Sequence, residues 1–244
     1  MLRGLYTAAS GMNHELKRLD AIADNLANVN TAGFKKDEMI AASFPAELYY
    51  AVKRREVQPI GFAPLGVETD QSFTYLTQGT VITTENPLDL AIIGEGYFLV
   101  ESNNNQYLTR NGHFTRNAEG YLATDNGDLV LGENGPIRLD GTVTVSADGE
   151  VRVNGQVVDR LLIVTPNDEA SLVKEGHSRF LFTGGWTRLA TPLVEQGAYE
   201  SSNVNTIEEM VKMIAVTRAY ESNQKVIATE DGVMDKIANE IGRV

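Results

Sequence analysis

The sequence has no cysteine among its 244 residues. Disulfides, thiolate metal ligands and cysteine nucleophiles are therefore excluded. It also has no apolar run near the roughly 18 residues that cross a bilayer as a helix. Polar or small residues interrupt the apolar core that a secretory signal peptide would need, at Ser10, Gly11, Asn13 and His14. We therefore expect neither a membrane-spanning helix nor a cleaved secretory signal.

Positive charge is scarce. There are 21 Lys and Arg against 33 Asp and Glu, which gives a net charge of −12. This balance argues against nucleic-acid binding as the main activity, because phosphate contacts need a basic surface. Apolar residues make up 42% of the chain, so it can bury a core and is not a disordered tail.

Residues that could carry chemistry are few and dispersed. The three histidines, His14, His113 and His177, lie far apart, and we expect them at the surface or in turns. Gly94-Glu95-Gly96 resembles the start of a dinucleotide motif, but the third glycine position holds Leu99, so a hairpin turn is predicted. The single Trp186 is interpreted as a partly buried core aromatic rather than a ligand platform. We predict no enzyme, no cofactor and no metal site.

A heptad pattern fills the first thirty residues. Its apolar positions alternate in steps of three and four: Leu2, Leu5, Ala9, Met12, Leu16, Leu19, Ala23 and Leu26. This spacing predicts a helix with a coiled-coil seam, about 40 Å long at ~1.5 Å per residue. Asn28, Asn30, Thr31 and Gly33 predict its end.

The C-terminal segment carries a second heptad pattern, at Met213, Tyr220, Ile227, Met234 and Ile241. Asn203 or Asn205 is predicted to cap the start of this helix. Gly232 lies inside the helix and weakens it.

Between these ends, short β-branched and aromatic runs alternate with turn residues. Six Asn-Gly or Asp-Gly pairs fall within residues 111–155, and such pairs favour tight hairpins. The predicted fold is α+β: heptad-patterned helices at both ends pair as a coiled coil and flank an inserted β-rich domain. The predicted domains are a discontinuous helical assembly core (1–35 plus 203–244), an extended linker (36–78) and a β-rich middle (79–202). The alternative is one α+β domain with both helices packed on the sheet.

Several segments together resemble flagellar rod, hook and hook-associated proteins. Residues 22–36 (IADNLANVNTAGFKK) resemble that family's N-terminal signature, and residues 87–98 (PLDLAIIGEGYF) its central motif. Residues 107–114 follow at the usual place, and residues 196–205 and 208–221 resemble the C-terminal signature.

The resemblance implies a structural subunit that polymerises into the basal-body rod, a drive shaft that transmits torque, after export by the flagellar type III apparatus. Its partners would be itself and other rod and hook subunits, without nucleic acid or membrane insertion. The implied assembly interface comprises Leu5, Met12, Leu16, Leu19, Leu26, Met213, Tyr220, Ile227 and Met234. The implied motif residues at the helix exits and entries are Asn25, Asn28, Gly33, Phe34, Ser202, Asn203 and Asn205.

The chain is too short for the extra outer domain of hook proteins, which leaves proximal or distal rod subunits. The length and residues 132–137 resemble the proximal type, which we favour slightly. The N-terminal signature and the Ser-Asn-Val-Asn run resemble the distal type. A secreted adhesin or carbohydrate-binding module, with a groove around Trp186 and Tyr199, is the alternative of another class.

Overall fold

The structure is a computed structural model that describes residues 2–43, 47–53, 56–63, 66–176 and 178–241. The chain divides into two compact units. Unit 1 comprises residues 1–27, 37–75 and 205–244, and unit 2 comprises residues 28–36 and 76–204. Each unit is described separately below. The fold class is α+β, with a helix near each end of the chain flanking a β-rich region.

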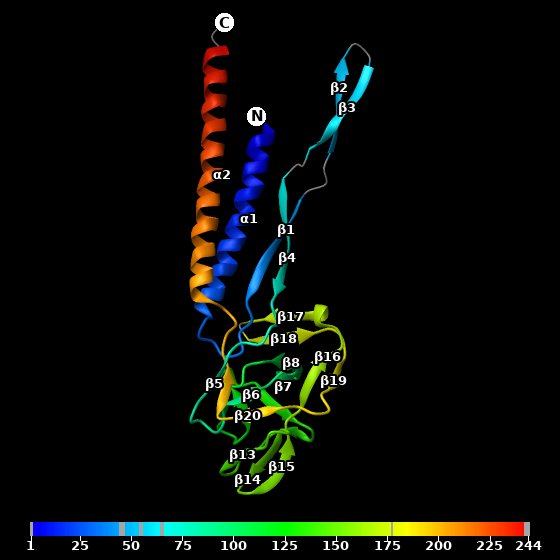
Figure 1. Ribbon diagram of the computed structural model, residues 1–244, viewed down its shortest axis with the longest axis vertical. Helices are drawn as coiled ribbons and strands as arrows, with labels where there is room; N and C mark the ends of the chain where they lie inside the picture. Colours follow the sequence, from blue (N-terminus) through cyan, green and yellow to red (C-terminus); the bar gives the residue numbers. More distant parts are fainter. Residues whose placement is uncertain (1, 44–46, 54–55, 64–65, 177, 242–244) are drawn as a thin grey trace. The chain divides into compact units, whose positions relative to one another are not determined.

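In its described residues, unit 1 contains two helices and four strands. They are α1 (Leu2–Ala27), β1 (Asp37–Ser43), β2 (Glu47–Lys53), β3 (Glu56–Ala63), β4 (Val67–Thr74) and α2 (Thr206–Ile241). The two helices run antiparallel and side by side (Figure 1). Among the described residues, no helix is long and apolar enough to cross a membrane.

Residues 37–43, 47–53, 56–63 and 67–74 form antiparallel strands in the region that the sequence assigned to an extended linker, and β1 and β4 lie beside α1 (Figure 1). β1 pairs with β4 from Asp37 opposite Thr74 to Ser43 opposite Val67, with an irregularity after Ile40. β2 pairs with β3. The backbone N–H of Val67 donates to Ser10 Oγ at 3.2 Å, which ties β4 to α1. From the sequence we expected only weak strands in an extended connection, and their pairing was not predicted because the segment lacks a strict apolar–polar alternation.

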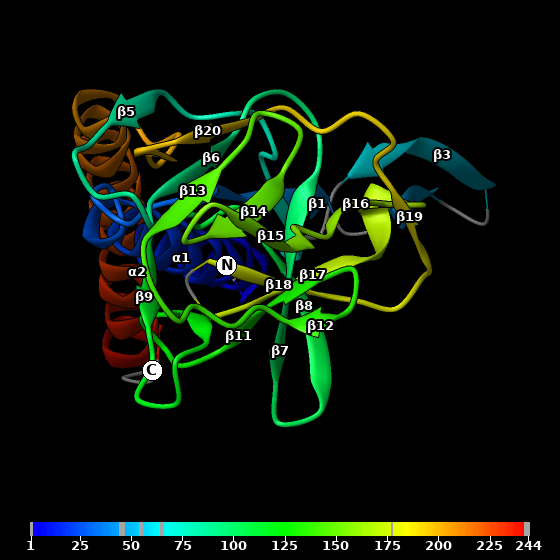
Figure 2. The ribbon, with the colours of Figure 1, turned by 90° about the horizontal axis from the view of Figure 1, so that it is seen from below.

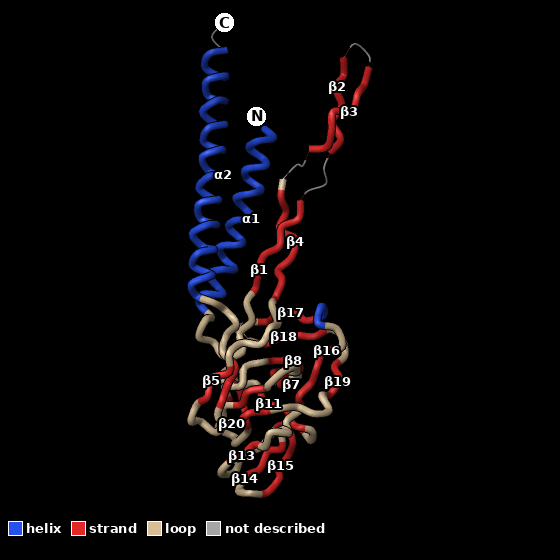
Figure 3. Tube along the Cα trace, in the orientation of Figure 1, coloured by secondary structure: helices blue, strands red, loops and turns tan. Residues whose placement is uncertain are grey.

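Unit 2 is built from strands, shown in red in Figure 3. The first group is β5 (Val81–Thr83), β6 (Leu90–Ile92), β7 (Tyr97–Ser102), β8 (Asn105–Thr109), β9 (Phe114–Arg116), β10 (Leu122–Thr124), β11 (Leu129–Gly132) and β12 (Gly135–Pro136). The second group is β13 (Val143–Val145), β14 (Glu150–Val153), β15 (Gln156–Arg160), β16 (Ile163–Pro166), β17 (Leu172–Glu175), β18 (Arg179–Phe182), β19 (Trp186–Arg188), β20 (Val194–Gln196) and β21 (Ala198–Glu200). A short 3-10 helix spans Glu169–Ser171.

The main sheet has the order β17-β18-β8-β7-β11-β10-β9, with β12, β16 and β19 attached off this path. β13, β14 and β15 form a separate antiparallel sheet and lie side by side in Figure 2. β20 pairs with β6, and β21 pairs with β5, so the last strands before α2 return to the first strands of the unit. The beginning and the end of unit 2 are thus held together by backbone hydrogen bonds, although they are distant in sequence.

Four of the six predicted turn pairs join paired strands: residues 126–127, 134–135, 148–149 and 154–155. Asn154 and Gly155 both have positive φ, as a type I′ turn requires. The pairs at 111–112 and 140–141 connect strands that do not pair. The β7–β8 hairpin instead turns at Asn103 and Asn104, both with positive φ, because asparagine tolerates the left-handed region.

Two apolar clusters form the core of unit 2. The larger includes Phe98, Val100, Phe114 and Leu161, with Phe98 and Phe114 in an edge-to-face pair at 5.1 Å. The second is Tyr97, Leu99, Leu108, Leu131, Val164 and Phe180. Trp186 is partly buried and packs against this second cluster, as predicted for a core aromatic.

Two local predictions were wrong. Residues 94–96 do not form a hairpin turn, because β6 pairs with β20 whereas β7 pairs with β8, β11 and β16. The segment therefore passes from one sheet to another. His14 is buried in α1 instead of lying at the surface. His113 is exposed by 44% and its Nδ1 lies 2.7 Å from Asp89 Oδ1, and His177 falls outside the described residues.

Candidate functional site

One line of α1 faces α2, and it is formed by small and polar residues. A Cβ atom added at Gly4 would lie 2.8 Å from Glu230 Oε1, and one added at Gly11 would lie 3.1 Å from Asn223 Nδ2. At the other end of α1, Asn25 Nδ2 donates to Glu209 Oε2 at 3.3 Å. These positions recur every seven or fourteen residues, so they lie on one side of the helix.

The predicted apolar stripe lies one residue further along α1. Leu5, Met12 and Leu26 directly follow Gly4, Gly11 and Asn25, and one residue rotates the helix by about 100°. Leu5, Met12, Leu19 and Leu26 are half-buried within the chain, and Leu16 is 46% exposed. The stripe thus sits about a quarter turn from the line that faces α2.

On α2, the predicted residues Met213, Tyr220, Ile227 and Met234 are half-buried. Val216, which lies between Met213 and Tyr220, is fully buried. The first three turns of α2 also carry exposed apolar side chains. They are Ile207 (75% exposed), Met210, Val211 and Ile214. The helix pair therefore keeps a substantial apolar surface that its own chain leaves in contact with solvent.

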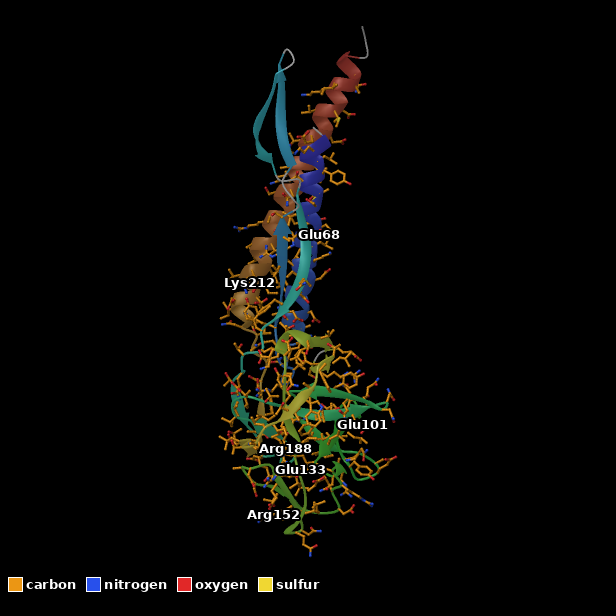
Figure 4. The ribbon with its side chains drawn as sticks, turned by 90° about the vertical axis from the view of Figure 1, so that its right-hand side faces the viewer. Glu68, Glu101, Glu133, Arg152, Arg188 and Lys212 are labelled. Atoms are coloured by element: carbon orange, nitrogen blue, oxygen red, sulfur yellow. The ribbon has the colours of Figure 1, made fainter. Side chains whose placement is uncertain are left out.

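Two asparagines of the sequence signatures fix the ends of the helices. The Asn25 side chain accepts from the Asp37 backbone N–H at 3.0 Å and donates to the Asp37 carbonyl at 2.8 Å. Asn205 Oδ1 accepts from the N–H groups of Ile207 and Glu208 at 3.0 and 3.3 Å, so Asn205 caps α2. In the next turn, Lys212 forms ion pairs with Glu208 and Glu209 at 2.9 and 3.2 Å (Figure 4).

In unit 2, the two sequence signatures meet. Gly33 has φ +66 and donates its N–H to the Glu200 carbonyl at 2.7 Å. Any Cβ at this glycine would lie 2.3 Å from the Arg110 carbonyl carbon, so only glycine fits. Phe34 is fully buried, and its carbonyl accepts from the Asn203 N–H at 3.3 Å.

The remaining signature residues support this meeting point. The Asn203 side chain accepts from the Lys36 N–H at 2.8 Å and donates to the Thr77 carbonyl at 3.2 Å. Asn28 is buried, and its carbonyl accepts from the Thr31 N–H at 3.1 Å. Ser202 Oγ accepts from the Val204 N–H at 3.3 Å. The side chains of Asn203 and Ser202 thus satisfy backbone groups that irregular segments would otherwise leave without partners.

A buried charge cluster lies at the centre of this junction. Lys35 is 0% exposed, Glu200 1% and Arg110 6%. Lys35 Nζ pairs with Glu200 Oε1 and donates to the Thr77 carbonyl at 2.7 Å. Arg110 Nη1 donates to Glu200 Oε2 at 3.2 Å, and the Gly79 N–H donates to Glu200 Oε1 at 2.8 Å. One carboxylate therefore holds together four segments of the chain.

Burial lowers the pKa of the Lys35 ammonium, and the opposing attraction of Glu200 does not fully offset it. Burial also raises the pKa of Tyr97 to about 12. The Arg110 guanidinium lies 5.1 Å from the centre of the Tyr97 ring. Among the described residues, no group of three or more His, Asp or Glu side chains could hold a metal ion.

Lys35, Arg110 and Glu200 all lie within the sequence motifs described above, but no role was predicted for them. Each of three motifs contributes one of these charged residues: Lys35 follows Phe34, Glu200 follows Tyr199, and Arg110 lies two residues before Gly112. That arrangement is a weak signal, because charged residues next to turns are usually solvated. The line Gly4–Gly11 was missed for another reason: glycine carries no apolar signal in a heptad pattern.

Three family models match the chain. They are the flagella basal body rod protein model over residues 5–35, the flagellar hook protein FlgE/F/G D1 domain over residues 91–153, and the flagellar basal body rod FlgEFG protein C-terminal model over residues 195–240. These ranges contain most of α1, six of the strands of the main sheet (β7 to β12) and nearly all of α2.

Curated relatives match along the whole chain. The flagellar basal-body rod protein FlgF of Caulobacter vibrioides is 31% identical and covers 100% of both chains. FlgG of Agrobacterium fabrum is 35% identical, over 94% of this chain and 96% of its own. FlgG of Bacillus subtilis is 33% identical, over 98% and 99%. The chain therefore belongs to the flagellar basal-body rod protein family.

Proposed function

We propose that this chain is a structural subunit of the flagellar basal-body rod that polymerises through its two helices. The exposed apolar surface of α1 and α2 supports this most directly. The stripe Leu5, Met12, Leu16, Leu19 and Leu26 stands about a quarter turn from the line that faces α2. The chain itself covers this stripe only in part, since four of its side chains are half-buried and Leu16 is 46% exposed. Contiguous apolar surfaces that a chain leaves open to solvent mark association sites.

We infer that α1 and α2 of one chain pair as a coiled coil, with Met213, Tyr220, Ile227 and Met234 on the α2 side. The apolar stripe of α1 then contacts the exposed apolar row of α2, Ile207 to Ile214, in a neighbouring copy. Two different surfaces meet in such a contact, so the interaction is heterologous and builds an open polymer. The helices and residues 37–75 form the assembly core, and the β-rich unit 2 stiffens the polymer.

In this function the chain acts mechanically and catalyses no reaction. Torque passes along the rod through interdigitated apolar side chains. The polymer lies in the basal body, its subunits leave the cytoplasm through the flagellar type III export apparatus, and its partners are other rod and hook subunits. We favour the proximal position on chain length; relatives named FlgF and FlgG match at similar identity. The adhesin alternative has no support, since Trp186 packs against the core.

The test is Leu16→Asp, with Asn13→Asp as the matched control. Both side chains are exposed on α1, and each variant adds one carboxylate, but only Leu16 belongs to the apolar stripe. We expect Leu16→Asp to abolish incorporation into isolated rods and Asn13→Asp to keep it. Trp186 fluorescence should show unit 2 folded in both. Normal incorporation of Leu16→Asp would count against the stripe as an assembly surface.

A further inference from the structure

A cavity of about 260 Å³ lies in unit 2, where β7 begins and β8 ends. Its lining includes Tyr97, the first residue of β7, and Arg110, which directly follows β8. Gly94, Glu95 and Glu169 also line the cavity, and all three are exposed, so the cavity opens to solvent. The cavity therefore lies at the open end of the β7–β8 hairpin.

Two buried side-chain atoms in the described part of the chain have no hydrogen-bond partner, and both belong to residues that line this cavity. They are Arg110 Nε and Thr165 Oγ1. Arg110 is 6% exposed, and its other two nitrogens donate to Glu200 and to the Gly94 carbonyl. Buried polar groups without a partner are rare, because each one costs stability. The cavity thus offers one N–H donor and one hydroxyl that groups of the same chain do not satisfy.

The polar groups around the cavity indicate the class of ligand. Arg110 can only donate, so the ligand must carry an acceptor, which an ammonium or a guanidinium lacks. The carboxylates of Glu95 and Glu169 line the same cavity and would repel an anion. A primary amide meets both conditions, because it is neutral, its oxygen accepts from Arg110, and its NH₂ group can donate to Thr165 or to a carboxylate. The cavity is therefore suited to the side chain of an asparagine or a glutamine.

The closed end of the same hairpin presents amide side chains. Residues 103–106 have the sequence Asn-Asn-Asn-Gln, and all four are exposed. Asn103 and Asn104 form the turn, with φ of +49 and +67. Glu101, near the end of β7, lies where this hairpin projects sideways from unit 2 (Figure 4). A projecting turn of this kind is accessible to another molecule.

We propose that the amide-rich turn at residues 103–104 of one copy inserts into this cavity of a neighbouring copy. The turn and the cavity lie at opposite ends of β7, which has six residues and is about 17 Å long, so a chain cannot fill its own cavity. Two different surfaces meet, so the contact is heterologous and repeats from copy to copy. The inference rests on the proposed function, because only a polymer brings turns and cavities together in series. It gives unit 2 a link between copies that is separate from the helices.

Cysteine cross-linking in isolated rods tests this contact, because the full-length chain has no cysteine of its own. Ser102→Cys marks the turn, and Ala170→Cys marks the cavity from the position next to Glu169, so every proposed contact residue is kept. With a short thiol cross-linker, rods of the double variant should give a ladder of covalent multimers. A mixture of the two single variants should stop at dimers. In the control, Asp125→Cys replaces Ser102→Cys and marks another turn with an exposed amide, Asn126, and it should give little product.

Two variants then remove the proposed hydrogen-bonding groups. Asn103→Gly with Asn104→Gly deletes both amides and keeps the turn, because glycine adopts positive φ. Thr165→Val deletes the unpaired hydroxyl and should not lower the urea midpoint of unit 2, since that hydroxyl has no partner within the described chain. Each variant should lower the yield of cross-linked product about fivefold, as expected for the loss of one or two hydrogen bonds. The controls Asn126→Gly and Thr144→Val, at exposed positions of the same unit, should leave the yield unchanged.

Asn103→Asp with Asn104→Asp distinguishes an amide from a carboxylate, since aspartate also tolerates positive φ. Repulsion from Glu95 and Glu169 should lower the yield, whereas a higher yield would show a site for carboxylates and would overturn the amide as ligand. Rods without a ladder, a ladder as strong in the Asp125→Cys control, or unchanged yields in both deletion variants would each overturn the contact itself.

A chain that forms no rods would count against the proposed function, and the contact would then be decided in a concentrated solution of the two single variants. A cross-linked dimer well above the Asp125→Cys control would support the contact there. A dimer no stronger than that control would overturn it.

Discussion

Neutralising Glu200 tests whether the buried junction of unit 2 holds the β-rich unit together. In Glu200→Gln, Lys35 and Arg110 would remain buried without a counter-ion, although the amide oxygen could still accept a hydrogen bond. Removal of one partner from a buried ion pair costs about 3–5 kcal/mol, because the other charge stays desolvated. We therefore expect unit 2 to lose a large share of the roughly 5–15 kcal/mol typical of a domain.

The measurement is urea unfolding followed by fluorescence of Trp186, the only tryptophan, which packs against the second core cluster of unit 2. With a slope of about 2 kcal/mol per molar urea, the midpoint should fall by about 2 M without a change of slope. Glu150→Gln is the control. Its pair with Arg152 is at the surface, so its loss should cost less than about 1 kcal/mol.

A double-mutant cycle isolates the pair itself. Lys35→Met should destabilise unit 2 in the native background and cost markedly less in the Glu200→Gln background, since the carboxylate partner is already gone. A midpoint shift for Glu200→Gln no larger than that for Glu150→Gln would refute the reasoning. Fully additive losses for Lys35→Met and Glu200→Gln would do the same.

Three further predictions concern other positions. Gly33→Ala should destabilise unit 2 by at least about 1–3 kcal/mol, and by more than Gly127→Ala does. Both glycines have positive φ, but only at position 33 would the added Cβ meet backbone atoms. Urea midpoints of the two variants test this. Burial lowers the pKa of His14 below its usual 6.5, so the unfolded state binds protons more readily and stability should fall as the pH drops below about 6.5. Circular dichroism from pH 7.5 to 5 should show a loss of helix signal in the native chain, and this loss should disappear in His14→Gln. Burial lowers the pKa of Lys35 in the same way, so its contribution to stability should rise with pH up to about 10.5. The raised pKa of Tyr97 acts in the opposite direction, with a loss of stability that begins near pH 10. The difference in stability between the native chain and Lys35→Met should therefore change between pH 8 and 10.

The helices could be predicted from the sequence because their apolar residues recur at strict heptad spacing. The predicted N-terminal helix matches α1, Leu2–Ala27, almost to the residue. Asn203 or Asn205 was predicted to cap α2, and Asn205 does so. The face that α1 turns toward α2 could not be predicted in this way. Gly4 and Gly11 contribute through close approach, which hydrophobic periodicity does not measure.

The sequence predicted that the middle of the chain is rich in β-strands, but it did not predict which strands pair. Asn-Gly and Asp-Gly pairs signal turns locally, whereas the pairing of β21 with β5 and of β20 with β6 depends on segments more than a hundred residues apart. The junction was missed for the same reason. Lys35 lies inside the segment 1–35 that was predicted to be helical assembly core, yet the structure groups it with unit 2. Removal of residues 1–35 would therefore remove a buried part of the β-rich unit.

The link between Lys35 and Glu200 also sets an order of events during synthesis. The two residues are 165 positions apart, so a growing chain exposes the Lys35 amine long before its carboxylate partner exists. Contacts of such high sequence separation form late and slowly, because the intervening chain must first be ordered. The β-rich unit consequently cannot close while the chain is incomplete. In a nascent chain this junction stays open until residue 200 of the 244 has been made.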